Sequence, residues 1–342
     1  MRISREGRRV VVRTPAKVNL FLEVLRRRDD GFHDISTVMC PISLCDTLAL
    51  ELTDTPKLDL LLDLPSDLDP PSDALRPSSD SVVAVSNGDT AWDIPADDRN
   101  LVLQGLAQLR QRTGFKGGAR VELTKRIPAS AGLGGGSSNA AGAIVALLVA
   151  MGQWDRTLAT ETAKSLGSDI PFFLGNERFC GLAVAEGRGE QCKSIDGEPD
   201  LRFVVTHPPK GCSTAEIYGG LQADYLRNHH TPHTHGFLVA ACQSGELEKI
   251  GAGLFNALQS TAVKRNPWIE RQLDILNECG GPYRLMSGSG SSCFAVLVGE
   301  QDDSEVHRRV VAKAHNIGIR RVYSASAFYS PSIEQQIREW AS

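Results

Sequence analysis

The chain has 342 residues, 41% of them hydrophobic, and its 37 basic and 41 acidic residues give a net charge of −4. This length suffices for one large or two ordinary domains, and the balanced charge excludes a general attraction to nucleic acid or to an anionic membrane. The longest apolar run, AIVALLVAM, is too short to cross a bilayer, and the basic N-terminus lacks the apolar segment of a secretory signal. We therefore expect a cytoplasmic protein with small-molecule partners and no nucleic-acid or membrane partner.

Strands and helices alternate in the first part of the chain. VVVRTPAKVNLFLEVL predicts two strands around a turn at Thr14–Pro15, and DTLALEL predicts a third strand. Residues 64–99 are rich in Pro, Ser and Asp, which indicates a surface insertion or a long hairpin arm. NLVLQGLAQLRQRTG then predicts a helix that ends at Gly114, and GARVELTKR predicts a strand.

A glycine-rich segment, IPASAGLGGGSSNAAG at 127–142, precedes the apolar run AIVALLVAM. Glycine costs about 0.5–1 kcal/mol relative to alanine inside a regular element, so the segment predicts a loop. Ser137, Ser138 and Asn139 are good N-cap residues before the helix that the apolar run predicts. The unpaired N–H groups of a helix N-terminus, approached by glycines, form a cradle suited to a di- or triphosphate. A flexible connector is the alternative interpretation.

Two common phosphate motifs do not match this segment. The Walker motif needs a lysine after its last glycine, but Ser137 follows Gly136 here. The dinucleotide fingerprint needs a third glycine, and Ser137 occupies that place when the count starts from Gly132 and Gly134. The segment is therefore a third type of glycine loop.

Helices and strands continue to the end of the chain. TLATETAKSLG predicts a helix followed by SDIPFFLG, and a second set begins with the strand LRFVVTHP. This set continues through helices near 213–227 and 236–260 and over RQLDILNECGG, then PYRLMSGSGSSCFAVLV, a helix over 303–317 and RRVYSASAF. The two sets predict two α+β domains, 1–195 and 196–342, with a cleft at their junction.

The spacing of the cysteines and histidines does not indicate a metal site. The eight cysteines form no CxxC pair and lie mostly among apolar residues, so we interpret them as buried reduced thiols. The histidine tract at 229–235 could bind a metal, but it has no cysteine or acidic ligand at a useful spacing. We interpret it as a solvated loop.

Five stretches in this order resemble the GHMP small-molecule kinase superfamily: TPAKVNLFLEV, RDDGFHDISTVM, IPASAGLGGGSSNAA, LGSDIPFFLG and LMSGSGSSCFAV. The resemblance covers most of the chain and fails mainly at 64–99 and around 228–240. It implies a two-domain α+β fold, with an N-terminal domain like domain 2 of ribosomal protein S5 and a ferredoxin-like C-terminal domain. The pairing of PAKVNLFL with DDGFH resembles the branch that phosphorylates the 2-hydroxyl of a cytidine diphosphate-linked methylerythritol in non-mevalonate isoprenoid synthesis.

The resemblance implies the residues that hold ATP and transfer the phosphoryl group. The glycine segment would bind ATP through Pro128, Gly132, Leu133, Gly134, Gly135, Gly136, Ser137 and Ser138. Lys17 and Asp169 would flank the acceptor hydroxyl, with Asp169 as general base. A carboxylate with a pKa of about 4 cannot deprotonate a free alcohol. In a loose transition state, however, the hydroxyl becomes acidic only as its bond to phosphorus forms. Lys17 would stabilise the transferring group and keep Asp169 ionised.

The resemblance also implies a cytidine site. Asn19 and His33 would bind the cytidine end, where a histidine with adjacent backbone can pair with the cytosine edge. Phe32 and Tyr218 would hold the base between their rings. Phe32 replaces the tyrosine that is commoner at this place in the family, which preserves stacking but removes a hydroxyl. Without the resemblance, both rings are compatible with a place in the core, Lys17 with a solvated charge, and Asp169 with a cap or turn.

Three further expectations complete the prediction. SGSGSSCF would support the phosphate loop from the second domain, a plain hairpin turn being the alternative. Mg²⁺ is expected with ATP because it offsets phosphate charge, but no carboxylate beyond Asp169 stands out as a ligand, so we predict no metal site in the protein. A monomer and a homodimer are both compatible with the sequence.

Two other functions remain open at this point. One is a related GHMP kinase acting on homoserine, mevalonate or a sugar, which need not carry DDGFH. The other is a catalytically silent ATP-binding regulator, which loss of Lys17 or Asp169 would have favoured; both residues are present.

Overall fold

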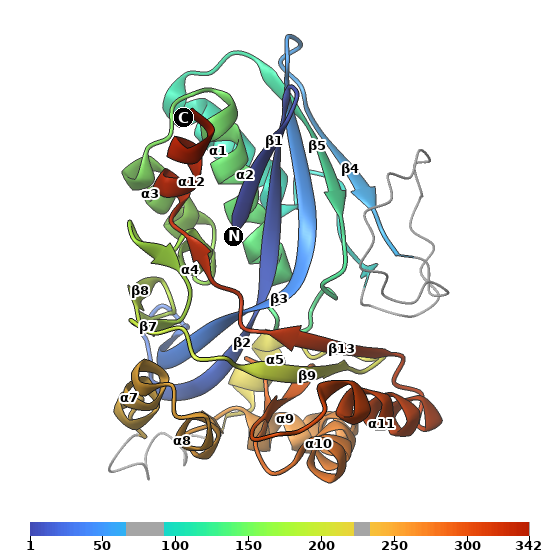
Figure 1. Ribbon diagram of the computed structural model, residues 1–342. Helices are drawn as coiled ribbons and strands as arrows, with labels where there is room; N and C mark the ends of the chain where they lie inside the picture. The colour runs from blue at the N-terminus through green and yellow to red at the C-terminus, as the bar shows by residue number, and fades with distance from the viewer. Residues whose placement is uncertain (66–91, 222–232, 342) are drawn as a thin grey trace.

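A large sheet and a smaller one, each with its own helices, form most of the structure (Figure 1). The computed structural model describes residues 1–65, 92–221 and 233–341. In the described residues, the large sheet has the order β1 (Arg2–Glu6), β2 (Arg9–Arg27), β3 (His33–Thr53), β5 (Gly118–Thr124) and β4 (Leu58–Asp63). Three further strands join it, β10 (Phe255–Asn256) beside β2, β7 (Ala183–Gly187) beside β3, and β8 (Gln191–Ser194) beside β7.

The predicted turn at Thr14–Pro15 is wrong, because both residues lie inside the continuous strand β2. Proline has no N–H to give to a ladder, and the pairing of β2 with β3 shifts register between Pro15 and Ala16. A second shift falls between Asn19 and Phe21. The irregularities therefore bracket Lys17, and such bulges re-aim the side chains beside them.

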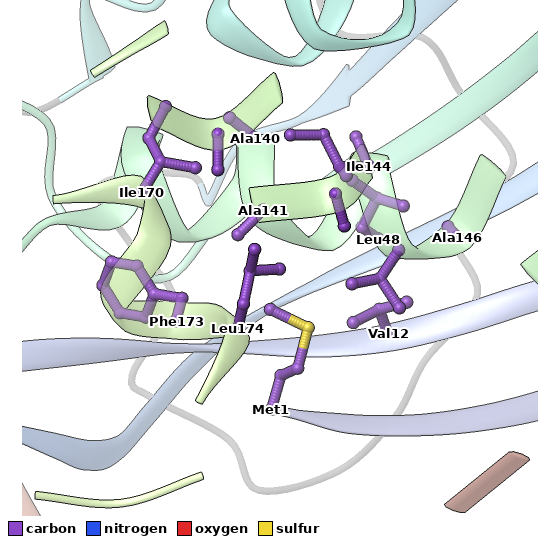
Figure 2. Packing of buried hydrophobic residues seen from close by; sticks show 14 of the residues in the cluster. Met1, Val12, Leu48, Ala140, Ala141, Ile144, Ala146, Ile170, Phe173 and Leu174 are labelled. Atoms are coloured by element: carbon purple, nitrogen blue, oxygen red, sulfur yellow. The ribbon is translucent and has the colours of Figure 1, made fainter. Parts of the chain in front are cut away.

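Helices α1 (Leu101–Thr113), α2 (Gly135–Ala150) and α3 (Arg156–Leu166) lie on one side of the large sheet (Figure 1). Helix α2 is almost entirely buried there, and Figure 2 shows Val12 and Leu48 of the sheet gathered with Ala141 and Ile144 of this helix. The sheet approaches the helix closely, since a Cβ at Gly142 would lie 2.4 Å from Thr14 Cγ2. Small residues in α2 are thus required by packing.

The start of α2 contradicts two predictions. Residues 135–142 are helical, not loop, and the N-cap is Gly134 with φ 69° rather than Ser137, Ser138 or Asn139. A left-handed residue at this place suits glycine, which has no Cβ to clash. Asn139 is used differently, because its side chain is bonded to Thr14 and Asp46 inside the protein. Burial of the helix outweighs the cost of its glycines.

A four-stranded antiparallel sheet forms the core of the second half. Its order is β11 (Arg284–Met286), β12 (Cys293–Leu297), β9 (Arg202–His207) and β13 (Arg321–Ser326). The helices of this half include α9 (Gln259–Arg265), α10 (Pro267–Gly280) and α11 (Asp303–Asn316). Figure 1 shows α10 and α11 on the side of this sheet that faces away from the large sheet.

The predicted helices near 213–227 and 236–260 are shorter in the structure. Helix α5 covers Thr214–Gly219, and residues 222–232 lie outside the described residues. Helix α7 (Gly236–Ser244) ends at Gly245 with φ 73°, and α8 (Leu247–Ala252) ends at Gly253. Strand β10 follows. Each glycine interrupts an apolar pattern that continues past it, which explains the error.

The two halves are joined at several places. Strand β10 of the second half pairs in parallel with β2, and β14 (Ser330–Pro331) pairs with β6 (Phe179–Cys180). The last helix, α12 (Ile333–Ala341), packs against β1, where Gln336 accepts a hydrogen bond of 2.8 Å from the Ile3 N–H. The predicted division at 195/196 stays a prediction.

The structure bears on several expectations that were drawn from composition. Six of the eight cysteines are buried, but Cys192 is exposed and Cys212 half-buried, so the interpretation as buried thiols is wrong for Cys192. The predicted insertion over 64–99 lies mostly outside the described residues. The end of the histidine tract contacts β3, with His235 Nδ1 2.8 Å from Ser36 Oγ, rather than being fully solvated. In the described part of the chain, no helix is long and apolar enough to cross a membrane.

Candidate active site

A cavity of about 1200 Å³ gathers residues from both halves of the chain. The predicted site residues in its lining are Lys17, Asn19, Phe32, His33, Gly132, Gly134, Asp169 and Tyr218. Of the other predicted residues, Gly135, Gly136, Ser137 and Ser138 form the first turn of α2, directly after Gly134. Pro128 and Leu133 are buried, and the Leu133 side chain belongs to the core between the halves. Their roles toward ATP stay predictions.

Lys17 and Asp169 meet in this cavity. Lys17 is buried on β2, and Asp169 directly precedes α4 (Ile170–Leu174). Lys17 Nζ lies 3.4 Å from Asp169 Oδ2, and the Asp169 side chain is 35% exposed. The Lys17 backbone N–H also donates to the Leu133 carbonyl at 2.9 Å, which ties β2 to the glycine segment. An ammonium and an accessible carboxylate are thus held beside the start of α2.

Asn19 contacts Lys17 of this pair, and its predicted role toward the cytidine stays a prediction. Residues two apart on a strand share a face, and Lys17 Nζ donates to Asn19 Oδ1 at 2.6 Å. The amide of Asn19 donates to Thr37 Oγ1 at 2.8 Å, and that hydroxyl in turn donates to the Phe21 carbonyl. Asn19 therefore orients Lys17. We refer to Lys17, Asn19 and Asp169 as the transfer group.

The SGSGSSCF stretch supports the glycine segment, as predicted. Ser287 Oγ donates to the Gly132 carbonyl at 2.9 Å, and the Ser292 N–H donates to the Ala131 carbonyl at 3.1 Å. A Cβ at Gly132 would lie 2.2 Å from the Ser287 carbonyl oxygen, so only glycine fits at this contact. The second half of the chain thus holds the glycine segment, which belongs to the first half, in place.

Three rings form a second group in the cavity, Phe32, His33 and Tyr218, which we call the ring group. The His33 and Tyr218 rings have centroids 5.1 Å apart and an interplanar angle of 35°. Phe32 is 54% exposed, so a core role is excluded for it. Tyr218 packs against the core of the second half, and burial raises the pKa of its hydroxyl. The predicted sandwich of a base between Phe32 and Tyr218 stays a prediction.

The protonation of His33 follows from its surroundings. Burial lowers the pKa of His33 below its ordinary value, and the positive charge of Arg27 lowers it further. The imidazole is therefore neutral at neutral pH, with one donor and one acceptor nitrogen. One nitrogen of a neutral imidazole can pair with a ligand edge, while an adjacent backbone group pairs with the neighbouring atom of that edge.

Sequence reasoning missed several lining residues. Thr37, Arg27 and Arg188 lie in the cavity wall, as do Ser213 and Thr214 before and in α5. The signal that could have indicated Arg188 is its place between two glycines, Gly187 and Gly189. The other residues carry no local signal, because their neighbours in the cavity come from distant parts of the chain.

Two family models match the chain. The model of the GHMP kinases N terminal domain matches residues 100–176, and that of the GHMP kinases C terminal domain matches residues 238–316. A 4-diphosphocytidyl-2-C-methyl-D-erythritol kinase of Rhodopirellula baltica is 36% identical over 298 residues, which cover 84% of this chain and 86% of that protein. The chain belongs to this family of GHMP kinases. It is therefore a small-molecule kinase that uses ATP.

Other members of the family and of the superfamily agree. A 4-diphosphocytidyl-2-C-methyl-D-erythritol kinase of Listeria innocua is 33% identical over 293 residues, covering 84% of this chain and 88% of that protein. A crystal structure of 4-(cytidine 5'-diphospho)-2C-methyl-D-erythritol kinase matches with a TM-score of 0.67 at 28% identity, covering 92% of this chain and 98% of that one. The L. major mevalonate kinase, at 14% identity and a TM-score of 0.67, shares the fold. The predicted α+β two-domain GHMP kinase fold is confirmed.

Proposed function

We propose that this chain transfers the γ-phosphoryl group of ATP to the 2-hydroxyl of 4-diphosphocytidyl-2-C-methyl-D-erythritol, in the non-mevalonate route to isoprenoid precursors. The observation that carries the proposal is that one cavity contains both the transfer group and the ring group. The substrate has a matching division, with an acceptor hydroxyl at one end and a cytosine at the other. The names of the relatives support the same substrate.

Asp169 acts as the general base. As the substrate oxygen bonds to the γ-phosphorus, the bond from phosphorus to the bridging oxygen of ADP breaks, and the hydroxyl proton moves to Asp169. The proton moves late, when the attacking oxygen has become acidic. The partial exposure of this carboxylate supports the role, because an oxygen that faces the cavity is free to meet substrate.

Lys17 and the start of α2 hold the transferring group. The Lys17 ammonium stabilises negative charge on the phosphoryl oxygens and lies 3.4 Å from the Asp169 carboxylate. The N–H groups of the first turn of α2, from Gly135 to Ser137, have no intrahelical partner and bind the ATP phosphates. Because the helix already fixes these N–H dipoles, they stabilise the phosphates without reorganising during phosphoryl transfer.

Mg²⁺ fits this site as a companion of ATP. In the described residues, no group of three or more His, Cys, Asp or Glu could hold a metal. The Ser138 hydroxyl is buried without a hydrogen-bond partner, and it lies on α2, which packs against the helix that Asp169 precedes. The Ser138 hydroxyl would supply an oxygen ligand of the kind that Mg²⁺ prefers, and the ion would offset phosphate charge.

The ring group recognises the cytidine end. Cytosine offers an amine donor beside a ring-nitrogen acceptor, and the neutral imidazole of His33 complements that edge. Phe32 offers an exposed flat face for stacking. Recognition and transfer therefore rest on different side chains, which can be tested separately.

A substrate panel tests the proposal. Purified protein with ATP and Mg²⁺ is given the cytidine-linked methylerythritol, homoserine, mevalonate and a sugar, and ADP release is measured together with the product mass. We expect turnover with the cytidine-linked substrate alone. Turnover with another acceptor would assign the chain to a different GHMP reaction, and ATP binding without any turnover would support a regulator.

A further inference from the structure

We propose that Arg188 binds the diphosphate that joins the two ends of the substrate, an inference that rests on the proposed function. The transfer group and the ring group account for the acceptor hydroxyl and the cytosine, but neither accounts for the charged bridge between them. Arg188 lines the same cavity and belongs to neither group.

The position of Arg188 relates it to both groups. It lies between Gly187 and Gly189, both with positive φ, in the turn that joins β7 and β8. A Cβ at Gly189 would lie 3.6 Å from Asp169 Oδ1, so this turn borders the transfer group. The guanidinium reaches the ring group, with Cζ 5.0 Å from the centroid of the Phe32 ring. Arg188 thus spans the region that a bridge between hydroxyl and cytosine must cross.

The charge of Arg188 is available to a ligand. Glu190 is its nearest carboxylate, but the Nε to Oε2 distance is 4.0 Å, and the same oxygen accepts the Arg188 backbone N–H at 2.8 Å. The main contact of Glu190 is therefore with the backbone of the turn, and its contact with the guanidinium is longer and weaker. The cation–π contact with Phe32 holds the guanidinium in place and leaves its N–H groups able to form paired hydrogen bonds.

The charges in the cavity wall match a diphosphate. Among the described residues, the lining contains three cations, Lys17, Arg27 and Arg188, and one carboxylate, Asp169. Lys17 is already paired with that carboxylate. Paired N–H groups of an arginine suit phosphate oxygens, and such charge-assisted bonds are about twice as strong as neutral ones. Arg27 lies near His33 and adds to the lowering of its pKa by burial. Arg188 differs from Arg27 because its turn borders Asp169 while its guanidinium contacts Phe32.

Comparing the affinities for cytidine and for cytidine diphosphate distinguishes contacts to the diphosphate from contacts to the base. Isothermal titration is done on wild-type protein and Arg188→Met, with the ATP site filled by a non-hydrolysable ATP analogue. Methionine keeps a long apolar side chain against Phe32 but removes the charge. We expect Arg188→Met to lower the affinity for cytidine diphosphate by about 10- to 100-fold, the range for losing hydrogen bonds to a charged group. The affinity for cytidine should change by less than about 2-fold.

Two further variants sharpen the test. Arg188→Lys keeps the charge but loses the paired geometry, so its loss should be intermediate. Arg178→Ala removes an arginine whose side chain is 79% exposed and which does not line this cavity, so both affinities should stay at the wild-type values.

The other outcomes are equally clear. If cytidine and cytidine diphosphate lose affinity together, Arg188 acts through Phe32 and the inference is overturned. If wild type prefers cytidine diphosphate and Arg188→Met keeps the full preference, only this inference fails. Wild-type protein that binds neither ligand contradicts the proposed function as well.

Discussion

The described residues include two buried lysines that each pair with an aspartate, and the two pairs differ in how many hydrogen bonds the aspartate accepts. Lys125 pairs with Asp46, and the two side chains are 3% and 0% exposed. Lys17 pairs with Asp169 at 3.4 Å, where the aspartate side chain is 35% exposed. The residue types are the same, but their surroundings are not.

Asp46 is surrounded by donors. Besides Lys125, it accepts hydrogen bonds from the backbone N–H groups of Arg126 at 2.6 Å and Ile127 at 2.8 Å, and from the Asn139 amide at 2.9 Å. These bonds join β3, the start of the glycine segment and helix α2. A carboxylate so fully bonded has no capacity left for a ligand.

Asp169 has spare acceptor capacity, and this distinguishes a reacting pair from a structural one. Its partner Lys17 is held from the other side by Asn19, so the ammonium is fixed while the carboxylate still faces the cavity. A buried pair whose every atom is bonded holds elements together. A pair with an open oxygen can take a proton. Two predictions test this difference, and two more test the ring group, which belongs to neither pair.

Replacing the open carboxylate should have the largest effect, and only on catalysis. We expect Asp169→Asn to lower kcat by about 10²–10⁴, the range for losing a general base. The thermal unfolding midpoint and the Kd for ATP should hardly change. Steady-state kinetics and calorimetry on one preparation provide the measurement. Near-normal turnover would remove Asp169 from the mechanism.

Breaking the closed pair should instead lower stability. Asp46→Ala leaves the Lys125 ammonium buried without its carboxylate, so the free energy of unfolding should fall by about 3–5 kcal/mol. Denaturant titration measures this. Asp59→Ala is the control, because Asp59 pairs with the 75% exposed Lys57, and surface pairs contribute about 0–1 kcal/mol. Equal losses in the two variants would contradict the proposed role of the Asp46 bonds.

The ring group should affect neither turnover nor stability strongly, only substrate binding. We expect His33→Ala to weaken binding of the cytidine-linked substrate by about 1–3 kcal/mol, since polar atoms of the base lose their partner. The KM for ATP should stay constant. Preference for cytidine over uridine substrates should shrink, because uracil reverses donor and acceptor at that edge. Full preference in the variant would show that another residue reads the base.

The smallest effect concerns pH. Burial and the Arg27 charge hold the pKa of His33 below its ordinary value, so substrate binding should weaken as the pH falls through that lowered pKa and the imidazole gains a proton. Arg27→Gln removes a positive charge, which makes protonation easier and raises the pKa. The rise in KM should then begin at a higher pH than in wild type. A shift in the opposite direction would be inconsistent with this electrostatic account.

Features encoded within a few residues were predictable from the sequence. Helix α1 begins after Asn100, whose side chain accepts the Val102 N–H at 2.9 Å, and it ends at Gly114 with φ 70°. Caps of this kind depend on the local backbone alone. Lys17 and Asp169 were predicted through the family resemblance of the short motifs that contain them, and the structure brings them together.

The remaining features depend on residues that are far apart in the chain. Gly134 rather than Ser137 caps α2, and a Cβ at Gly134 would lie 3.0 Å from Lys17 Cγ, a neighbour on another element. In the sequence, Asp46 looks like an ordinary surface charge, and only the flanking Gly187 and Gly189 mark Arg188. Asp46 is buried by Asn139, which lies 93 residues away, and Arg188 meets a phenylalanine from the loop before β3. A local pattern sets which conformation a segment prefers, but the packing of distant segments sets which atoms meet, because burial and hydrogen-bond saturation exist only once the chain has folded.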